Sequence, residues 1–280
     1  RMRASWCAGV VLLVAAIALG ERLSDEQVDD VAFSVFEGSA RVDHECQRKE
    51  QFGRKGAAYE ICLDYFRKGN CVVYSIGVDQ DWSFETDVIN RLDCEVHMFD
   101  PGPGPPAGSL PQGAQFHQVA IGDRDGDGLI NGSPQPMSMR RISSLMRELN
   151  HTHLDYLKFD GEGAEYGALC DILSDTHMTG RVAQIGVEFH WMPSYFWWQD
   201  STSFFSNAEH VLDLLETAGF QVFDKHDHRR WCQELFYIHI GAAAALHTGH
   251  QFPAVPIESP PASLPFPNPS PDTIRQLNQR

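Results

Sequence analysis

The segment L-D-Y-L-K-F-D-G-E-G-A-E, residues 154–165, decides the fold of this chain. Its first half is an apolar run of the length of a strand, and its second half delivers carboxylates into a helical pattern at residues 164–174. A strand that leads directly into a helix is the unit from which helix-covered sheets are built. The segment therefore predicts an α/β unit with acidic side chains at the carboxyl end of its strand.

The same alternation continues on both sides of this segment. Short apolar runs alternate with helical ones at residues 71–77, 83–92, 95–99, 115–121, 137–149, 154–159, 164–174, 182–189, 207–218, 220–224 and 232–240. Strands alternating with helices predict a doubly wound, mostly parallel sheet with helices on both faces. The last two runs are separated only by a polar stretch, residues 225–230, which predicts a hairpin at one edge of the sheet.

Composition and charge limit the class of protein. The 280 residues give room for one large domain or two small ones, and 42% hydrophobic with 21% charged residues is typical of a globular protein. There are 22 Lys and Arg against 38 Asp and Glu, a formal net charge of −16. Such an acidic chain lacks the basic surface that binds phosphate backbones, so no nucleic-acid partner is expected.

The first twenty residues are typical of a secretory signal. Arg1 and Arg3 precede an uncharged run from Trp6 to Leu19, and small residues lie around Gly20. As a helix this run rises about 21 Å, less than the roughly 30 Å of a hydrocarbon core. We expect residues 1–20 to be a signal peptide, with a short signal anchor as the alternative and the only expected membrane contact. The expected location is the secretory pathway, lumenal in the Golgi or endoplasmic reticulum, or secreted.

Glycosylation acceptors and cysteines fit that compartment. The triplets that begin at Asn131 and Asn150 match the acceptor pattern and predict a glycoprotein. Without Cys7, six of the seven cysteines remain, an even number that allows up to three disulfides. Buried free thiols are the alternative for Cys94 and Cys170, which lie in apolar runs.

Sequence patterns divide the remaining chain into three parts. Residues 21–69 carry helical spacing, for example at Val28, Val35 and Phe36, and predict a helical preface. Residues 70–245 hold the alternating pattern and form the main domain. Residues 246–280 are expected to be a disordered, proline-rich tail, because eight of the sixteen prolines lie from residue 251 onward.

Two neighbouring strand ends suggest a site for an adenosine-containing ligand. The strand from Cys71 ends in Gly77, and a helix is expected to begin with Ser83 as its amino-terminal cap. About twenty residues on, the next strand ends in Asp100, where an acidic side chain accepts hydrogen bonds from ribose hydroxyls. The alternative is that Asp100 only begins the turn before Pro101. The three-glycine phosphate motif is absent, so dinucleotide binding is not supported.

Several motifs in this order resemble a known family. The segment at 154–165 resembles the hallmark of the FkbM-type S-adenosylmethionine-dependent methyltransferases. The runs V-V-Y-S-I-G-V-D-Q-D-W-S-F-E, C-E-V-H-M-F-D-P, Q-I-G-V-E-F-H and C-Q-E-L-F-Y-I are similar to those of animal methyltransferase-like proteins near that family. The resemblance spans about residues 45–240.

The resemblance implies a seven-stranded, Rossmann-like methyltransferase sheet over residues 70–245, with S-adenosylmethionine bound across its first two strands. Ser75 and Gly77 would face the methionine part of the donor, Asp100 its ribose and Asp123 its adenine edge. Many methyltransferases have a glycine-rich first motif, which is reduced here to Gly77 alone. The donor contacts near Gly77 are therefore expected to differ from the common pattern.

The sulfonium of the donor already supplies a good leaving group, so the enzyme must mainly align the nucleophile with the methyl carbon. A hydroxyl acceptor also needs a base. Asp160, Glu162, Glu188 and His190 follow or end adjacent predicted strands and should converge on the acceptor side. We expect His190 or Asp160 to be the base and Glu162 to position the acceptor, a small molecule or glycan. The alternatives are structural: Glu162 favours a helix amino terminus, and His190 is a half-buried histidine.

Three further interpretations stay open from the sequence. The same side chains could hold a divalent cation that lowers the pKa of an acceptor hydroxyl, although their spacing assigns no metal ligands. Trp191 and the aromatic residues that follow it could form a wall for a flat acceptor, a lid or part of the core. The run Asp123-Arg-Asp-Gly-Asp-Gly128 matches the start of a calcium-binding loop, but its twelfth position is Pro134. The competing functions are thus a catalytically inactive binding or scaffold protein, and an extracellular calcium-binding module.

Overall fold

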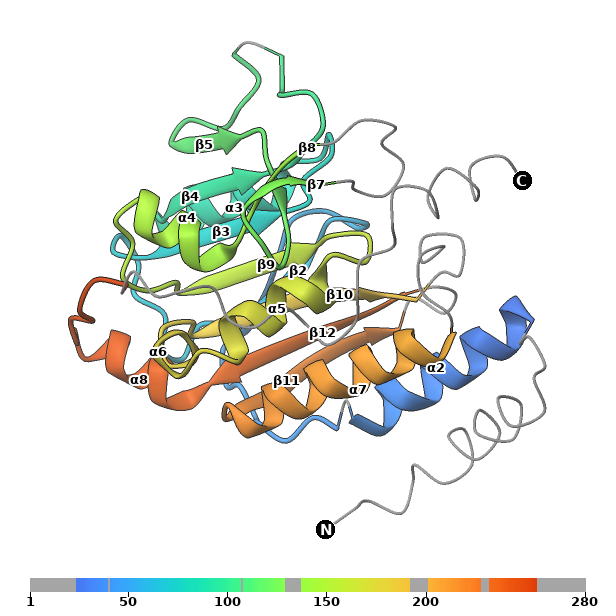
Figure 1. The fold of residues 1–280 in the computed structure, drawn as a ribbon. Helices are drawn as coiled ribbons and strands as arrows, with labels where there is room; N and C mark the ends of the chain where they lie inside the picture. Colours follow the sequence, from blue (N-terminus) through green and yellow to red (C-terminus); the bar gives the residue numbers. More distant parts are fainter. Residues whose placement is uncertain are drawn as a thin grey trace.

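The computed structural model describes residues 24–39, 41–106, 108–128, 137–191, 201–227 and 232–255. A seven-stranded sheet lies at its centre (Figure 1). Its strands are β3 (Val72–Ile76), β4 (Glu95–Phe99), β5 (Ala114–His117), β9 (Tyr156–Asp160), β10 (Gln184–His190), β11 (Phe220–Asp227) and β12 (Cys232–His239). Their order is β11-β12-β10-β9-β3-β4-β5. All neighbours from β10 to β5 are parallel, whereas β12 runs antiparallel to both β10 and β11. The predicted parallel sheet with an edge hairpin is confirmed.

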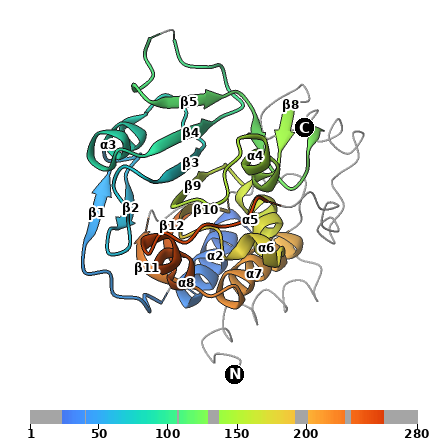
Figure 2. The same ribbon diagram turned by 90° about the vertical axis from the view of Figure 1, so that its left-hand side faces the viewer.

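Helices cover one face of the sheet, and two helices with a hairpin cover the other (Figure 2). The helices are α2 (Asp25–Ser39), α3 (Ser83–Leu92), α4 (Ile142–Glu148), α5 (Glu165–Leu173), α6 (Thr176–Thr179), α7 (Ser201–Thr217) and α8 (Ile240–His247). Apolar residues of α2, α4, α5 and α7 share one core with the sheet, and those of α3 and α8 share the second with the hairpin β1 (Lys49–Phe52) and β2 (Tyr59–Cys62). A small sheet of β6 (Ala120–Ile121), β8 (Met137–Arg140) and β7 (Gly126–Gly128) follows β5 in the chain.

Parallel register brings three strand ends to one edge of the sheet. Ile76 at the end of β3 pairs with Phe99 of β4 on one side and with Phe159 of β9 on the other. The residues that follow, Gly77 and Asp100, and the last residue of β9, Asp160, therefore lie together at the carboxyl edge. This edge carries the candidate site.

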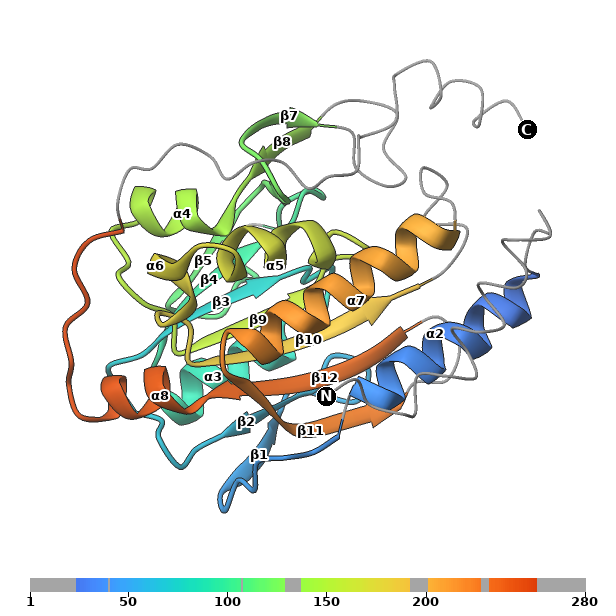
Figure 3. The same cartoon turned by 60° about the horizontal axis from the view of Figure 1, so that its bottom comes forward.

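The amino-terminal part departs from the predicted helical preface. Only its first section is a helix, α2, and the remainder contributes the β1–β2 hairpin. Figure 3 shows α2 running beside α7 along one face of the sheet. Trp191 is buried there, stacks on Phe36 and donates its indole N–H to Asp29 at 2.6 Å. Core packing, one of the interpretations of Trp191, is therefore confirmed, and an acceptor wall is not formed by this residue, because α2 covers its ring.

The start of α3 also differs in detail from the sequence prediction. Ser83 is the first helical residue and not the cap, since Trp82 occupies that position without a side-chain cap bond. The side chain of Asp81 takes over the role and accepts from the Ser83 N–H at 2.9 Å. The Ser83 hydroxyl instead accepts from the Arg54 N–H at 2.9 Å, which ties the hairpin to the helix.

Several sequence predictions lie outside the described residues. These are the signal segment at 1–20, the acceptor triplet at Asn131, the aromatic residues after Trp191 and most of the proline-rich tail. Within the described ranges, no helix has the length and hydrophobicity needed to span a bilayer.

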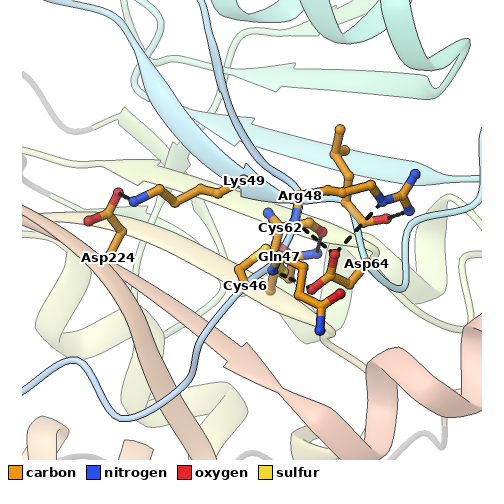
Figure 4. Close-up of a disulfide and its surroundings, with 9 residues drawn as sticks. Cys46, Gln47, Arg48, Lys49, Cys62, Asp64 and Asp224 are labelled. Atoms are coloured by element: carbon orange, nitrogen blue, oxygen red, sulfur yellow. Dashed lines mark hydrogen bonds and ion pairs between the residues drawn. A yellow bond between two sulfur atoms is a disulfide. The ribbon is translucent and has the colours of Figure 1, made fainter.

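Two disulfides fix the amino-terminal side of the sheet. Cys46–Cys62 holds the segment before β1 to the end of β2, where Asp64 accepts from the Gln47 and Arg48 N–H groups (Figure 4). Cys71–Cys94 joins the residues that precede β3 and β4. Cys170 is a buried free thiol, as one alternative held, but Cys94 is not. The parallel pairing of β3 and β4 explains the second bridge, because it places their preceding residues side by side.

Replacing both Cys71 and Cys94 by Ser should lower the free energy of unfolding by about 3 kcal/mol, since the bridge closes a loop with a sequence separation of 23. Denaturant unfolding of the oxidised parent and of the double variant measures the difference. The matched control is Cys170→Ser under the same conditions, which breaks no bridge. A parent whose stability is unchanged by a reducing agent would contradict both disulfides.

Candidate active site

Gly77 lies where β3 and β9 come closest at the carboxyl edge. Its φ is +71°, and a Cβ built at this position would lie 1.6 Å from the Asp160 carbonyl oxygen. No side chain fits, so glycine is required by both conformation and space. The Gly77 N–H donates to the Phe99 carbonyl at 3.0 Å, which holds the strand exit against β4 as well. Gly77 therefore lets the end of β3 approach β9 with no side chain between the two strands.

Asp100 organises the loop that leaves β3. Its Oδ2 accepts from the backbone N–H groups of Val78 at 3.1 Å and Asp79 at 3.2 Å, and its Oδ1 accepts from Gly102 at 2.7 Å. Asp100 therefore does begin the turn before Pro101, which was the alternative to ribose binding. A carboxylate offers about four acceptor positions, so roughly one is left for a ligand. Asp100 can support the loop and still accept one further hydrogen bond.

The other two predicted donor contacts lie further from this loop. Ser75 is fully buried in β3, and its hydroxyl donates to the carboxylate of Glu85 on α3. Asp123 lies against α5, where its Cβ is 3.3 Å from the position of a Cβ built on Gly167. Direct contact of either side chain with a methyl donor remains a prediction.

Lys158 is a site residue that the sequence reading passed over. It is buried in β9, and its ammonium donates to the Gly77 carbonyl at 2.7 Å. Its charge also acts on Glu85 and Asp160, and so it partly offsets the burial that raises the pKa of both carboxyls. A lysine inside an otherwise apolar strand was the available signal, because a buried cation requires partners.

A carboxylate cluster surrounds His190 at the ends of β9 and β10. It consists of Asp160, Glu162, Glu165 and Glu188 around the buried imidazole. Glu165 is closest, with its Oε1 3.2 Å from Nδ1 and 2.8 Å from the backbone N of His190. The Nε2 atom lies 3.7 Å from Asp160, 3.8 Å from Glu162 and 3.7 Å from Glu188. The four predicted catalytic residues are therefore together, with Glu165 as a fifth member.

The charges in this cluster change the role expected for His190. Burial alone would lower its pKa, but Glu165, Asp160 and Glu188 outweigh burial and raise the pKa of His190 to about 10. At neutral pH the imidazole is protonated and cannot take a proton from an acceptor. The expectation of His190 as base is thus disfavoured, while its positive charge holds the surrounding carboxylates together.

The carboxyls are the better candidates for proton transfer. Burial raises the pKa of Asp160 and Glu162, and burial followed by the charge of Asp160 raises that of Glu188. A carboxyl with a raised pKa holds a transferred proton more firmly near neutral pH. Glu162 has a left-handed backbone, φ +50°, and a side chain 56% exposed, so it stands at the rim of the cluster.

Cys232 was noted in the sequence only as a cysteine. It is a free thiol at the start of β12, and it pairs with His190 in the antiparallel register. Burial and the neighbouring carboxylate of Glu188 raise the pKa of its thiol well above the ordinary value. The thiol is therefore protonated and donates to Glu188 instead of acting as a nucleophile.

The calcium-loop interpretation does not fit the observed partners of Asp125. Its carboxylate receives the Arg141 backbone N–H at 3.0 Å, the Arg141 Nε at 3.3 Å and the Ser144 hydroxyl at 2.7 Å. A guanidinium thus occupies the oxygens that a calcium ion would need. The Asp123–Asp127 run is also absent from the groups of convergent ligand atoms among the described residues.

Replacing Gly77 by Ala should destabilise the protein strongly, because the methyl group meets the Asp160 carbonyl. We expect a loss of roughly 4 kcal/mol or more in denaturant unfolding. Gly56→Ala is the matched control, since Gly56 has φ +94° but no atom within 4 Å of the built Cβ. It should lose only about 1–2 kcal/mol from backbone strain. Equal losses in the two variants would mean that the close approach at Gly77 is not real.

His190 should remain protonated up to a pH of about 10, whereas His117, whose pKa is lowered first by burial, should be neutral at pH 7. Imidazole NMR signals across a pH titration measure both. Because the folded-state pKa of His190 lies above its unfolded value of 6.5, its contribution to stability is complete below pH 6.5. That contribution is lost as the pH rises to about 10. A His190 that titrates near 6.5 would restore it as a candidate base.

Comparison with known proteins places this geometry in a family. A methyltransferase-domain family model matches residues 21–239. Probable methyltransferase-like protein 24 of Homo sapiens is 26% identical over 181 residues, which are 60% of this chain and 48% of that protein. The Rattus norvegicus protein of the same name is 29% identical over 138 residues, 46% of this chain and 38% of that protein. The chain spans about half or less of the length of these relatives.

One solved structure with a related outline is M. capricolum TrmK in complex with S-adenosylhomocysteine. It has 8% sequence identity and a TM-score of 0.34, and the match covers 62% of this chain and 64% of that one. So distant a likeness says nothing about the ligands of this chain. The family match covers most of the chain and agrees with the seven-stranded sheet, and the chain belongs to the methyltransferase-domain family.

Proposed function

We propose that this methyltransferase uses S-adenosylmethionine and methylates an oxygen atom of a hydroxyl or carboxyl acceptor. The observation that carries the proposal is the contact between Gly77 and the Asp160 carbonyl. It joins the loop held by Asp100 to the carboxylate cluster, so that a donor site and an acceptor site share one boundary. The bound donor would supply an electrophilic methyl group on a sulfonium.

The residues present fit such a donor on the side of β3 and β4. Gly77 leaves the strand end bare, and Asp100 retains about one acceptor position for a ribose hydroxyl. The carboxylate cluster has more negative than positive charge and lies directly beyond this edge. Its field favours a cationic group, such as a sulfonium, in the neighbouring space.

On the acceptor side we assign Asp160 as the proton acceptor. It lies at the boundary with Gly77, and its raised pKa suits it to take a proton from a hydroxyl. His190 acts as its protonated partner, and Glu162 at the rim positions the acceptor. The excess of carboxylates repels anions, which favours a hydroxyl over a carboxyl acceptor, supports a neutral small molecule or glycan and argues against nucleic acid.

A divalent cation is not part of this proposal. Two groups of convergent ligand atoms include His190, one with Asp160 and Glu162 and one with Glu188 and Cys232. Proton transfer by a carboxyl needs no metal in this arrangement.

The proposed compartment is the secretory pathway, with the protein lumenal or secreted. The disulfides Cys46–Cys62 and Cys71–Cys94 support it, because such bridges persist in oxidising compartments. Asn150 is exposed, in keeping with a glycosylation acceptor. Membrane contact would come only from an uncleaved segment at residues 1–20.

A second candidate function is a binding protein that has the fold without turnover. It is favoured by one observation, that Asp100 already accepts three backbone hydrogen bonds. A donor bound more weakly than in an active enzyme would follow from this. The same experiment separates the two functions.

S-adenosylmethionine at a hundred times its dissociation constant should stabilise the chain by about 2.7 kcal/mol and raise the melting temperature by roughly 5–11 °C. Asp100→Asn keeps the size of the side chain but loses its charge, and should reduce the shift. Asp213→Asn, the same change at an exposed position of α7, is the matched control. No shift in the folded parent would refute donor binding.

Methyl transfer is then measured with labelled donor and a panel of neutral oligosaccharides and small polyols. Transfer that is lost in Asp160→Asn but not in Asp213→Asn supports the proposed enzyme. A clear melting shift without transfer to any acceptor would favour the binding protein instead.

A further inference from the structure

A histidine and carboxylate group lies on the sheet far from the candidate active site. Glu95 is the first residue of β4, His97 is the third, and His151 follows α4. His97 is buried and His151 is half-buried, with side chains 2% and 10% exposed, whereas Glu95 is 48% exposed. Along β4, Glu95 is five residues from Asp100, about 17 Å at the rise of a strand. The group therefore has no part in the proposed methyl transfer.

Two imidazole nitrogens converge on one carboxylate oxygen in this group. Glu95 Oε1 lies 3.0 Å from His97 Nε2 and 3.5 Å from His151 Nε2. All three ligand atoms lie within 4.8 Å of one another. Ligands around a tetrahedral zinc ion, with bonds of about 2.0–2.1 Å, are roughly 3.3–3.4 Å apart. The observed spacings bracket that separation.

The far sides of both rings are held by further partners. His97 Nδ1 lies 2.9 Å from His117 Nε2, and His151 Nδ1 lies 2.8 Å from the Tyr74 hydroxyl. Both partners can accept an Nδ1–H, so each ring can present the lone pair of its Nε2 to the centre of the group. Metal-bound histidines are commonly oriented in this way by a hydrogen bond to the second nitrogen.

From these contacts we propose that Glu95, His97 and His151 form a binding site for a divalent cation of the zinc type. Two imidazoles and one carboxylate supply three ligands, and water completes a tetrahedron. The ion would join the start of β4 to the turn after α4, with Tyr74 of β3 and His117 of β5 behind it. Its role is to stabilise this end of the sheet.

Competing groups among the described residues offer less to a metal ion. Cys46 and Cys62 are joined in a disulfide. In the group of Glu60, Asp224 and His226, the Lys49 ammonium already lies 2.5 Å from Asp224. The groups at His190 belong to the carboxylate cluster of the candidate active site.

The test uses the full chain, first freed of metal with a chelator, and Co²⁺ and Zn²⁺ as probes. We expect one Co²⁺ per chain with the visible absorption of a tetrahedral site, displaced by Zn²⁺. Saturating Zn²⁺ should raise the melting temperature by roughly 5–11 °C. Glu95→Gln removes an exposed ligand and should weaken binding at least tenfold, as should His151→Asn.

His153→Asn is the matched control, because His153 lies on the same turn but pairs with Asp155 at 3.4 Å. Its affinity for Co²⁺ should equal that of the parent. Melting temperatures in chelator show whether each variant folds, and Glu95→Gln is the decisive one since its side chain is half exposed. Absence of stoichiometric binding, or equal binding by the parent, Glu95→Gln and His151→Asn, would overturn the proposal. No methyl donor is present, so this result is independent of the proposed function.

Discussion

The close approach of Gly77 to the Asp160 carbonyl is the constraint on which the site depends. Parallel pairing of β3 with β9 brings the two strand ends together, and the absence of a side chain at Gly77 lets them meet. Lys158 of β9 then donates a hydrogen bond to the Gly77 carbonyl, so β9 also holds the turn that follows β3. The loop after Gly77 can therefore be short and fixed, with Asp100 collecting its backbone N–H groups.

The carboxylate cluster follows from the same arrangement. Strand ends that converge also bring their side chains together, and four carboxyls at this edge would repel one another without a cation. His190 supplies that cation together with Lys158, and the raised pKa of His190 is the consequence of Glu165, Asp160 and Glu188. The cluster is thus an electrostatic unit in which the histidine keeps its charge and burial raises the pKa of Asp160, Glu162 and Glu188. A residue type usually expected to act as a base becomes an electrostatic partner.

The sheet could be predicted from the sequence because the patterns that indicate it are local. Apolar runs, helical spacing and the carboxylates at 160–165 each lie within one element, and the pattern of their alternation implies the parallel order. The sequence could also predict that Asp160, Glu162, Glu188 and His190 converge. It could not predict their protonation, because the pKa of His190 depends on distances between residues of different strands. The roles of Trp191 and Cys94 stayed open, and that of Ser83 was wrongly predicted, for a similar reason. Their partners are Asp29, Cys71 and Arg54, all distant in sequence.

The two ends of the sheet are built differently, and the difference has a physical basis. At the amino end, Cys71–Cys94 joins β3 to β4, and the buried Asp155 accepts from the Val72 N–H at 2.9 Å, which joins β3 to β9. His97 and His151 add a further connection around Glu95. At the carboxyl end the same strands carry a left-handed Glu162, a bare Gly77 and carboxyls with raised pKa values, all of which cost stability. Strands pinned at one end tolerate such strain at the other, since unfolding the carboxyl edge alone does not release the sheet.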